Sequence, residues 1–281
     1  MSLKFSPVIA SRAQGSGAGF SARSVDLHEL GKRASPVVVL DHFRVRGRPF
    51  PPHPHAGFSA VTYVFEDSQT GLRSRDSLGN DVVVGPGGIC WTQAGSGLLH
   101  EELPAEPGRE LHGLQVFVNL SARNKLVSPR VFRLAASEIP DWRNDANDRV
   151  RIVAGSFDGI ASPLCPAEPF TLVDVALRQE ISFTLEDAHN ALVYVLEGGL
   201  VVRADGDRQK VPEEHAVALY GSGGLITFQA ARPARFLILS GAEINEPVLV
   251  HGPFVMSEPS QIDDAVARYR SGGMGRLTRC Q

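Results

Sequence analysis

Short apolar segments separated by turn residues constrain this chain more than any other feature. Segments such as AVTYVFE (60–66), GLQVFVNL (113–120) and RFLILSG (235–241) have strand length and are rich in β-branched and aromatic residues. Turn sequences such as SLGND (77–81) and RADGD (203–207) separate them. Strands at this spacing, with hardly a helical period between them, predict an all-β fold, a sandwich or barrel rather than βαβ units.

One helical pattern occurs near the C-terminus. Ile262, Val266 and Tyr269 recur at helical spacing in SEPSQIDDAVARYRSGG (257–273). Ser257 or Ser260 could cap the start of such a helix, and a glycine at 272 suits its end. The pattern predicts a short helix packed on a sheet.

A faint internal repeat suggests how the strands are divided. VTYVFED (61–67) resembles LVYVLEG (192–198) at an offset of 131 residues, and the strands that follow align at an offset of 127. A chain of 281 residues also exceeds the usual size of one domain. We therefore expect two related β domains, residues 1–138 and 139–281, joined near the polar segment 137–148.

Composition excludes several classes of function. The formal net charge is −3 and no run of like charges occurs, so nothing indicates direct nucleic-acid binding. The apolar stretches are too short to span a bilayer, and the N-terminus lacks the apolar core of a signal peptide. Cys90, Cys165 and Cys280 are scattered and form no C-x-x-C motif, which is typical of reduced thiols. We expect a cytoplasmic protein without membrane contact.

Two pairs of polar residues have the spacing of metal ligands. His53 and His55 are two residues apart, so their side chains share one face of an extended segment, and Pro54 favours that extended geometry. His100 and Glu102 form a second such pair some 45 residues later. Three imidazoles and a carboxylate from two strands could surround one divalent ion.

The alternative is that these are ordinary core or surface histidines. The repeat offers an internal comparison, because an offset of 131 aligns the first pair with Thr184 and Glu186, and an offset of 127 aligns the second with Thr227 and Gln229. The second copy keeps the strand pattern without the histidines. The fold alone therefore does not require them, which favours the metal hypothesis.

The remaining candidates are weaker. His42 and His112 sit near expected strands and could orient a ligand, although a structural role is the simpler interpretation. Glu101 should point to the opposite face from Glu102 and be solvated. No Walker A sequence occurs, and Ser96 lacks the glycine that a G-x-S-x-G turn needs.

Together these motifs resemble the pirin family, two-domain members of the cupin superfamily. The resemblance is carried by LDHF (40–43), FPPHPHAGFSAVTYVFE (50–66), RDSLGND (75–81), GPGGICWTQAGSGLLHEE (85–102), LHGLQVFVNL (111–120) and EPVLVHGPFVMS (246–257). It implies two tandem cupin β-barrels of the jelly-roll type with a short C-terminal helix. It also implies one metal ion, commonly iron, held in the first barrel by His53, His55, His100 and Glu102, and a second barrel without a metal site.

The sequence departs from the family pattern beside the expected site. Ala56 and Ser59 stand where the family usually has an arginine and a glutamate, which we expect to change the polarity of the pocket and the choice of substrate. EPVLVHGPF (246–254) resembles a family signature whose role the sequence does not explain. The simplest expectation is that it docks the final strand and helix.

The resemblance implies two kinds of function. Some pirin-like proteins are similar in activity to quercetin 2,3-dioxygenases, and others bind transcription factors or metabolic enzymes. Our leading hypothesis is oxidative cleavage of a flavonol-like substrate by O2 at Fe(II), although the ligand set also suits Ni, Co, Mn, Cu or Zn. Glu102 would accept the proton of the substrate hydroxyl, and the candidate walls of the pocket are Phe58, Trp91 and Phe117. The alternative is a metal-containing regulatory protein that binds a protein partner.

Overall fold

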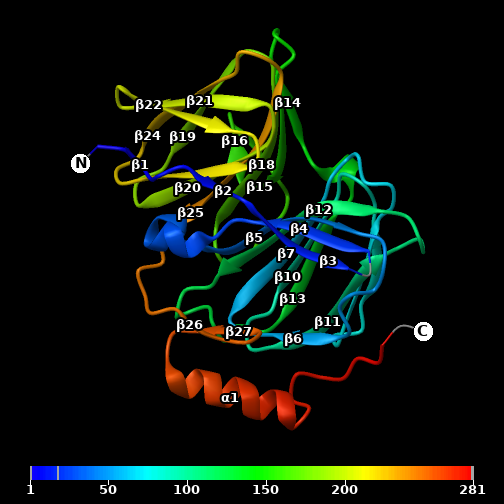
Figure 1. Cartoon of the computed structure of the whole chain (residues 1–281). Coiled ribbons are helices and arrows are strands. Elements are labelled where there is room, and N and C mark those ends of the chain that lie inside the picture. The colour runs from blue at the N-terminus through cyan, green and yellow to red at the C-terminus, as the bar shows by residue number, and fades with distance from the viewer. Residues whose placement is uncertain (1, 18, 280–281) are drawn as a thin grey trace. The chain divides into compact units, whose positions relative to one another are not determined.

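The structure, a computed structural model, describes residues 2–17 and 19–279. The chain forms two compact units, both built from β-strands (Figure 1). Unit 1 comprises Met1–Arg12, Arg23–Val38 and Glu138–Glu243, and unit 2 comprises Ala13–Ala22, Val39–Ser137 and Ile244–Gln281. The chain passes from unit 2 to unit 1 next to the boundary expected from the sequence. Each end of the chain, however, contributes to the unit formed mainly by the other half.

Unit 2 contains the histidine motifs and has two main sheets. The larger sheet has seven strands, in the spatial order β13 (Arg130–Leu134), β10 (Ile89–Gln93), β7 (Phe58–Val64), β12 (Leu111–Asn119), β5 (Val37–Val45), β4 (Phe20–Ser24) and β3 (Arg12–Gly17). The smaller sheet has four strands, in the order β6 (His53–His55), β11 (Leu98–Pro104), β8 (Leu72–Asp76) and β9 (Asp81–Val84). Alternating side chains of both sheets meet in an apolar barrel core that includes Val64, Leu72, Cys90 and Leu111.

The C-terminal segment, residues 244–279, covers one end of unit 2. It forms the hairpin of β26 (Leu249–His251) and β27 (Phe254–Met256), followed by the helix α1 (Pro259–Arg270), drawn in orange and red in Figure 1. Ile262, Ala265 and Val266 of the helix pack with Phe254 and Met256 of the hairpin. The expected helix is confirmed, and so is the docking role of the EPVLVHGPF segment.

The start of helix α1 differs from the expectation. Its N-cap is Glu258 rather than a serine, and the Gln261 side-chain oxygen accepts hydrogen bonds from the main-chain N–H groups of Glu258 and Ser257. This is the glutamine half of a capping box. The helix ends at Arg270, two residues before the glycine expected to stop it.

Unit 1 repeats the two-sheet plan. Its larger sheet has the order β1 (Lys4–Phe5), β23 (His215–Tyr220), β20 (His189–Glu197), β25 (Ala234–Ala242), β18 (Phe170–Leu177), β15 (Arg149–Ala154) and β14 (Asp141–Arg143), with β2 (Ile9–Ala10) also on β23. Its smaller sheet has the order β19 (Glu180–Leu185), β24 (Gly224–Gln229), β21 (Gly199–Ala204) and β22 (Asp207–Pro212). The remaining elements are the hairpin β16 (Ser156–Phe157) with β17 (Ile160–Ala161) and the 3₁₀ turns η1 (Leu27–Glu29), η2 (Gly31–Ala34) and η3 (Ala136–Glu138).

The pairs between named strands are antiparallel, and α1 is the one α-helix of the described residues. The all-β fold with a short C-terminal helix is therefore confirmed. Within the described residues, α1 is too short and too polar to cross a membrane. Cys90 is buried and Cys165 is exposed, both as free thiols, and Cys280 lies outside the described residues.

Candidate metal centre

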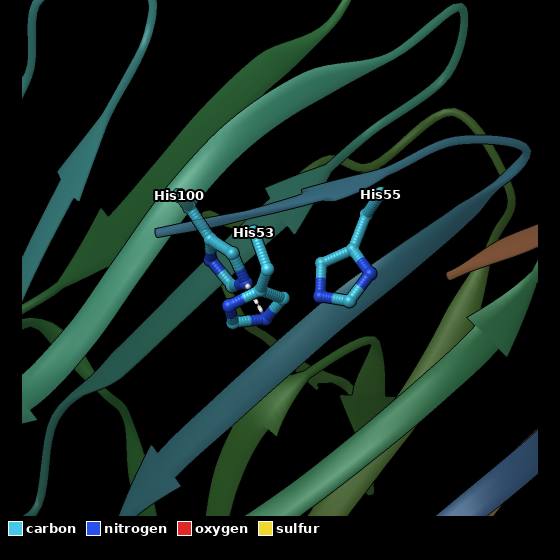
Figure 2. A group of neighbouring side chains, drawn as sticks. All are labelled: His53, His55 and His100. Atoms are coloured by element: carbon cyan, nitrogen blue, oxygen red, sulfur yellow. Dashed lines mark hydrogen bonds between the residues drawn. The ribbon is translucent and has the colours of Figure 1, made fainter. Parts of the chain in front are cut away.

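Three imidazoles converge in unit 2. His53 and His55 come from β6, and His100 comes from β11, where it lies directly opposite His53 in the antiparallel ladder. Their ligand nitrogens all lie within 4.8 Å of one another, and the Nε2 atoms of His53 and His100 are 3.2 Å apart (Figure 2). Each pair of rings has its centroids 4.7 Å apart. The structure thus brings together the three histidines that the spacing selected.

The local sequence explains this convergence. Alternation along an extended strand directs His53 and His55 to one side and Pro54 to the other. Proline has no N–H to offer a strand ladder, and β6 lies at the edge of its sheet, where none is required. The turn before β11 is closed by a hydrogen bond of 2.8 Å from the Gly97 N–H to the Ala94 carbonyl, as expected from its glycines.

The distance between the Nε2 atoms of His53 and His100 fits a shared ion. Two nitrogens that each bind one ion at about 2.1 Å lie as far apart as the observed 3.2 Å when the angle at the ion is about 100°. His53 Nδ1 lies 2.9 Å from the Pro51 carbonyl, an arrangement in which Nδ1–H donates and Nε2 keeps its lone pair. The cluster therefore offers neutral nitrogen ligands of the kind that divalent transition metals bind.

Burial keeps His55 and His100 uncharged. The pKa of His55 is lowered to about 3, first by desolvation and then by the neighbouring His53, while the carbonyl of Pro253 acts in the opposite direction. The pKa of His100 is lowered well below its ordinary value by desolvation and by both other histidines. Both rings are neutral at pH 7, which is the form that a metal requires.

Glu102 lies on the same face of β11 as His100 but is not a member of the three-histidine cluster. Its Oε2 accepts a hydrogen bond of 2.8 Å from the Thr62 hydroxyl, which also lies 3.4 Å from Gln115 Oε1. Desolvation raises the pKa of Glu102 to about 7, and the bond from Thr62 partly offsets this rise. The role of Glu102 as fourth ligand stays a prediction, and the polar partners Thr62 and Gln115 are residues that sequence reasoning missed.

Two of the expected pocket residues touch the cluster. Phe58 and Phe117 lie against His55, with ring centroids 5.0 and 5.3 Å from the imidazole, and against each other at 4.6 Å. Trp91 is buried on the opposite face of β10 from Cys90, a member of the barrel core. The two phenylalanines are therefore the aromatic side chains that can form an apolar wall at this site.

His42 and His112 form a separate pair. Their Nε2 atoms are 2.7 Å apart, and Nδ1 of His112 lies 2.9 Å from Asp67 Oδ2. Strand alternation places both on the opposite face of their sheet from Phe43 and Leu111, which belong to the barrel core. Their expected role in orienting a ligand stays a prediction.

Glu101 corrects one expectation. It does point away from Glu102, but its side chain is only 1% exposed and forms an ion pair of 2.9 Å with Arg75 instead of being solvated. The same Arg75 nitrogen donates to the Thr278 carbonyl, so the C-terminal segment covers this pair. A strand read alone does not reveal that a distant segment will bury its outer face.

Ala56 and Ser59 are the two positions at which the sequence departs from the family pattern beside the expected site. The Ala56 side chain is fully buried in a cluster with Phe254, Met256 and Met274 of the C-terminal segment, on the other face of the chain from His55. Ser59 is also buried. The alanine at position 56 therefore alters the docking of the C-terminal segment rather than the walls around the imidazoles.

A cavity of about 240 Å³ lies elsewhere in unit 2. Its lining includes Arg46, Arg48 and Arg73 together with Leu103 and Pro104 of β11, and none of the three clustered histidines. This cavity does not coincide with the candidate metal centre.

Both halves of the chain match known protein families. Residues 19–118 match the Pirin family and residues 172–275 match the Pirin C-terminal cupin domain. A pirin-like protein of Solanum lycopersicum is 34% identical over 272 residues, which cover 95% of this chain and 91% of that protein. A Pseudomonas aeruginosa protein provisionally named a quercetin 2,3-dioxygenase is 33% identical over 253 residues, 86% of this chain and 87% of that protein.

The solved structures agree with this assignment. The crystal structure of quercetin 2,3-dioxygenase from Acinetobacter baumannii has a TM-score of 0.85 and 26% sequence identity, and the match covers 99% of this chain and 100% of that one. The arrangement of two tandem cupin barrels expected from the motifs is thereby confirmed. From its sequence and its fold alike, the chain belongs to the pirin family.

Proposed function

We propose that this protein is a metal-dependent dioxygenase that cleaves the ring of a flavonol such as quercetin. The observation that carries the proposal is the cluster of His53, His55 and His100, whose ligand nitrogens lie within 4.8 Å of one another. Two similar proteins, from Pseudomonas aeruginosa and Acinetobacter baumannii, bear the name of this activity. Fe(II) is the ion we propose, and the same donor set accepts Ni, Co, Mn, Cu or Zn.

A bound divalent ion supplies positive charge that favours the anion of a substrate hydroxyl and a place for O2 beside it. Glu102 is the residue we propose to take up the hydroxyl proton. A divalent ion beside Glu102 would favour its carboxylate anion, which is the form that accepts a proton, and the Thr62 hydroxyl donates a hydrogen bond to Oε2. Glu102 would combine this role with that of fourth ligand.

Phe58 and Phe117 would orient the flat substrate and exclude water. The half-buried Phe117 ring would contact the substrate, and the fully buried Phe58 would hold that ring in place, since the two centroids are 4.6 Å apart and both rings lie beside His55. An aromatic substrate stacked there would bring its hydroxyl groups toward the imidazoles, and the lack of polar atoms on this wall favours an apolar ring.

The proposal is tested with protein loaded anaerobically with Fe(II). After O2 is admitted, we expect loss of the visible absorbance of quercetin together with release of carbon monoxide. His100→Ala should lose both the bound metal and the activity. His28→Ala is the matched control, because this histidine is exposed in unit 1 and its loss should change neither.

Failure to turn over quercetin and related flavonols in protein that binds one metal ion would overturn the proposal. That result would favour the alternative function, a metal-containing protein that acts by binding a transcription factor or a metabolic enzyme. Protein that binds no metal ion would rule out both functions.

A further inference from the structure

Lys125 is an ammonium group enclosed by oxygen atoms in the interior of unit 2. Its side chain is fully buried. Nζ donates to the carbonyls of Gly57 and Val255, at 2.8 and 2.9 Å, and to the side-chain oxygen of Asn119. An ammonium group has three N–H donors, and each has one of these acceptors. The three acceptor groups carry no charge. Burial of a lysine is costly, so its place here calls for a reason beyond packing.

The two carbonyls belong to segments that are distant in sequence but paired in space. Gly57 follows the histidine strand β6, and Val255 lies in β27 of the C-terminal hairpin. Residue 56 forms an isolated bridge with Phe254, and the Val255 N–H donates to the Ala56 carbonyl at 3.0 Å. Lys125 therefore joins the main chain next to His55 to the hairpin.

The main chain at position 57 lies so close to Val255 that this position requires glycine. Gly57 has a φ of +84°, and a Cβ atom at this position would lie 1.9 Å from the Val255 carbonyl oxygen. No other residue allows β6 and β27 to approach so closely. The chain is thus shaped to bring this hairpin against the metal-ligand strand.

The hairpin also reaches the imidazole itself. The Pro253 carbonyl accepts a hydrogen bond of 3.4 Å from the Ala56 N–H, directly after His55, and it lies near enough to the imidazole to raise its pKa, although His55 Nδ1 makes no hydrogen bond among the described residues. Figure 2 shows one ring nitrogen of His55 pointing toward His53 and His100 and the other pointing away from them. A carbonyl on the far side of the ring favours a proton on that nitrogen, so the nitrogen that faces the cluster keeps its lone pair.

We infer that Lys125 is a positioning residue of the metal centre, which fixes the Pro253 carbonyl against His55 through the main chain of Gly57 and Val255. The EPVLVHGPF segment then has a role beyond docking, because it places a main-chain carbonyl near one expected ligand, His55, whereas the Pro51 carbonyl lies 2.9 Å from Nδ1 of His53. Outer partners of this kind typically change metal affinity by about 10–100-fold. The inference rests on the proposed function only in taking the three histidines as metal ligands.

The test uses Lys125→Met, which keeps the length of the side chain and removes its three donors. We expect Co(II) to bind this variant at least about tenfold more weakly than the wild type, with a changed visible spectrum. The ¹⁵N resonances of His55 in the metal-free protein should show a loss of the single tautomer. Lys210→Met is the matched control, because the same change on an exposed strand of unit 1 should leave all three readouts unchanged.

Leu200→Ala, which should destabilise the core of unit 1, is the reference for a variant that affects stability alone. If Lys125→Met lowers the thermal stability as Leu200→Ala does but keeps the Co(II) spectrum, the affinity and the His55 tautomer, the inference is wrong. Asn119→Ala, which removes one acceptor, serves if Lys125→Met does not fold, and it should give a smaller loss of affinity. The tautomer measurement needs neither metal nor turnover, so failure of the proposed function would leave this test intact.

Discussion

Phe183 lies directly opposite Ile226 in the ladder between β19 and β24 of unit 1. In unit 2, strands β6 and β11 hold the same places in the order of the smaller sheet, and there His53 pairs with His100. Both apolar side chains are buried in the core of unit 1. The two barrels thus share a scaffold, and they differ at this rung in whether it carries apolar packing or potential ligands.

The stability of the metal-free protein should depend on pH in a direction set by the buried histidines. Below about pH 6.5 the unfolded chain binds protons at His55 and His100, whereas the folded protein does not, because folding lowers both pKa values. Each therefore lowers the free energy of unfolding by about 1.4 kcal/mol for every pH unit of acidification. Glu102 acts oppositely, because its raised pKa gives stability that is present below pH 4.5 and lost as the pH rises through about 7.

Glu102→Gln should consequently steepen the loss of stability between pH 6.5 and 4.5 by about 1.4 kcal/mol per pH unit. Urea unfolding of the metal-free variant at a series of pH values measures this slope. Glu106→Gln, at an exposed position, is the control. Equal slopes for Glu102→Gln and the wild type would show that this carboxyl ionises alike in the folded and unfolded chain.

Glu101→Gln should be strongly destabilising. Glu101 is 1% exposed and pairs with Arg75, whose side chain is 18% exposed, so the variant removes the nearer carboxylate of this little-exposed charge and leaves only Asp81 at 3.6 Å. We expect a loss of about 3 kcal/mol in the free energy of unfolding. Glu106→Gln breaks the exposed pair with Arg109 and should cost less than about 1 kcal/mol. Similar losses in the two variants would contradict the importance of burial.

Gly57→Ala should release the metal without abolishing the fold of unit 1. The added Cβ would collide with the Val255 carbonyl, so β6 and the hairpin must separate. Gly79→Ala is matched to it, because Gly79 also has a positive φ of +96° but nothing within 4 Å of the new atom. The control should lose only about 1–2 kcal/mol from backbone strain and keep its metal, as measured by metal analysis and urea unfolding. Retention of the ion by both variants would argue against close contact at β27.

Phe117→Leu should weaken substrate binding more than metal binding. The change removes an aromatic surface beside His55 and Phe58 while keeping an apolar side chain. An aromatic pair is worth about 1 kcal/mol beyond its buried area, so KM for the flavonol should rise about fivefold at constant metal content. Phe132→Leu, on β13, is the control. A fall in kcat at constant KM would instead place Phe117 in the chemical step.

The sequence carries enough information for the strands and for the three histidines, because periodic alternation and i, i+2 spacing are local signals. The alignment of the repeats does not hold for the ligand strands. His53 and His100 lie opposite each other, whereas their aligned residues do not, because Thr184 pairs with Leu225 and Thr227 with Ser182. A small slip in register changes which side chains face the core, so an alignment by sequence alone does not identify the equivalent buried positions.

Features that depend on distant contacts could not be read from the sequence. Lys125 stands in a turn with no partner spacing, and its acceptors are main-chain carbonyls that any residue could supply. Glu101 looked solvated because nothing local shows that Thr278 and its neighbours cover Arg75. The exchange of the chain ends between the units is equally invisible, since a strand pattern does not state which sheet a strand will join.

That exchange sets an order of assembly. The histidine strands are translated early, whereas the hairpin that packs against them lies beyond Ile244, after nearly all of unit 1 has been made. A nascent chain can therefore form the ladder between β6 and β11 long before the carbonyl of Pro253 arrives behind His55. The site is therefore completed only after the strands of unit 1 have been made.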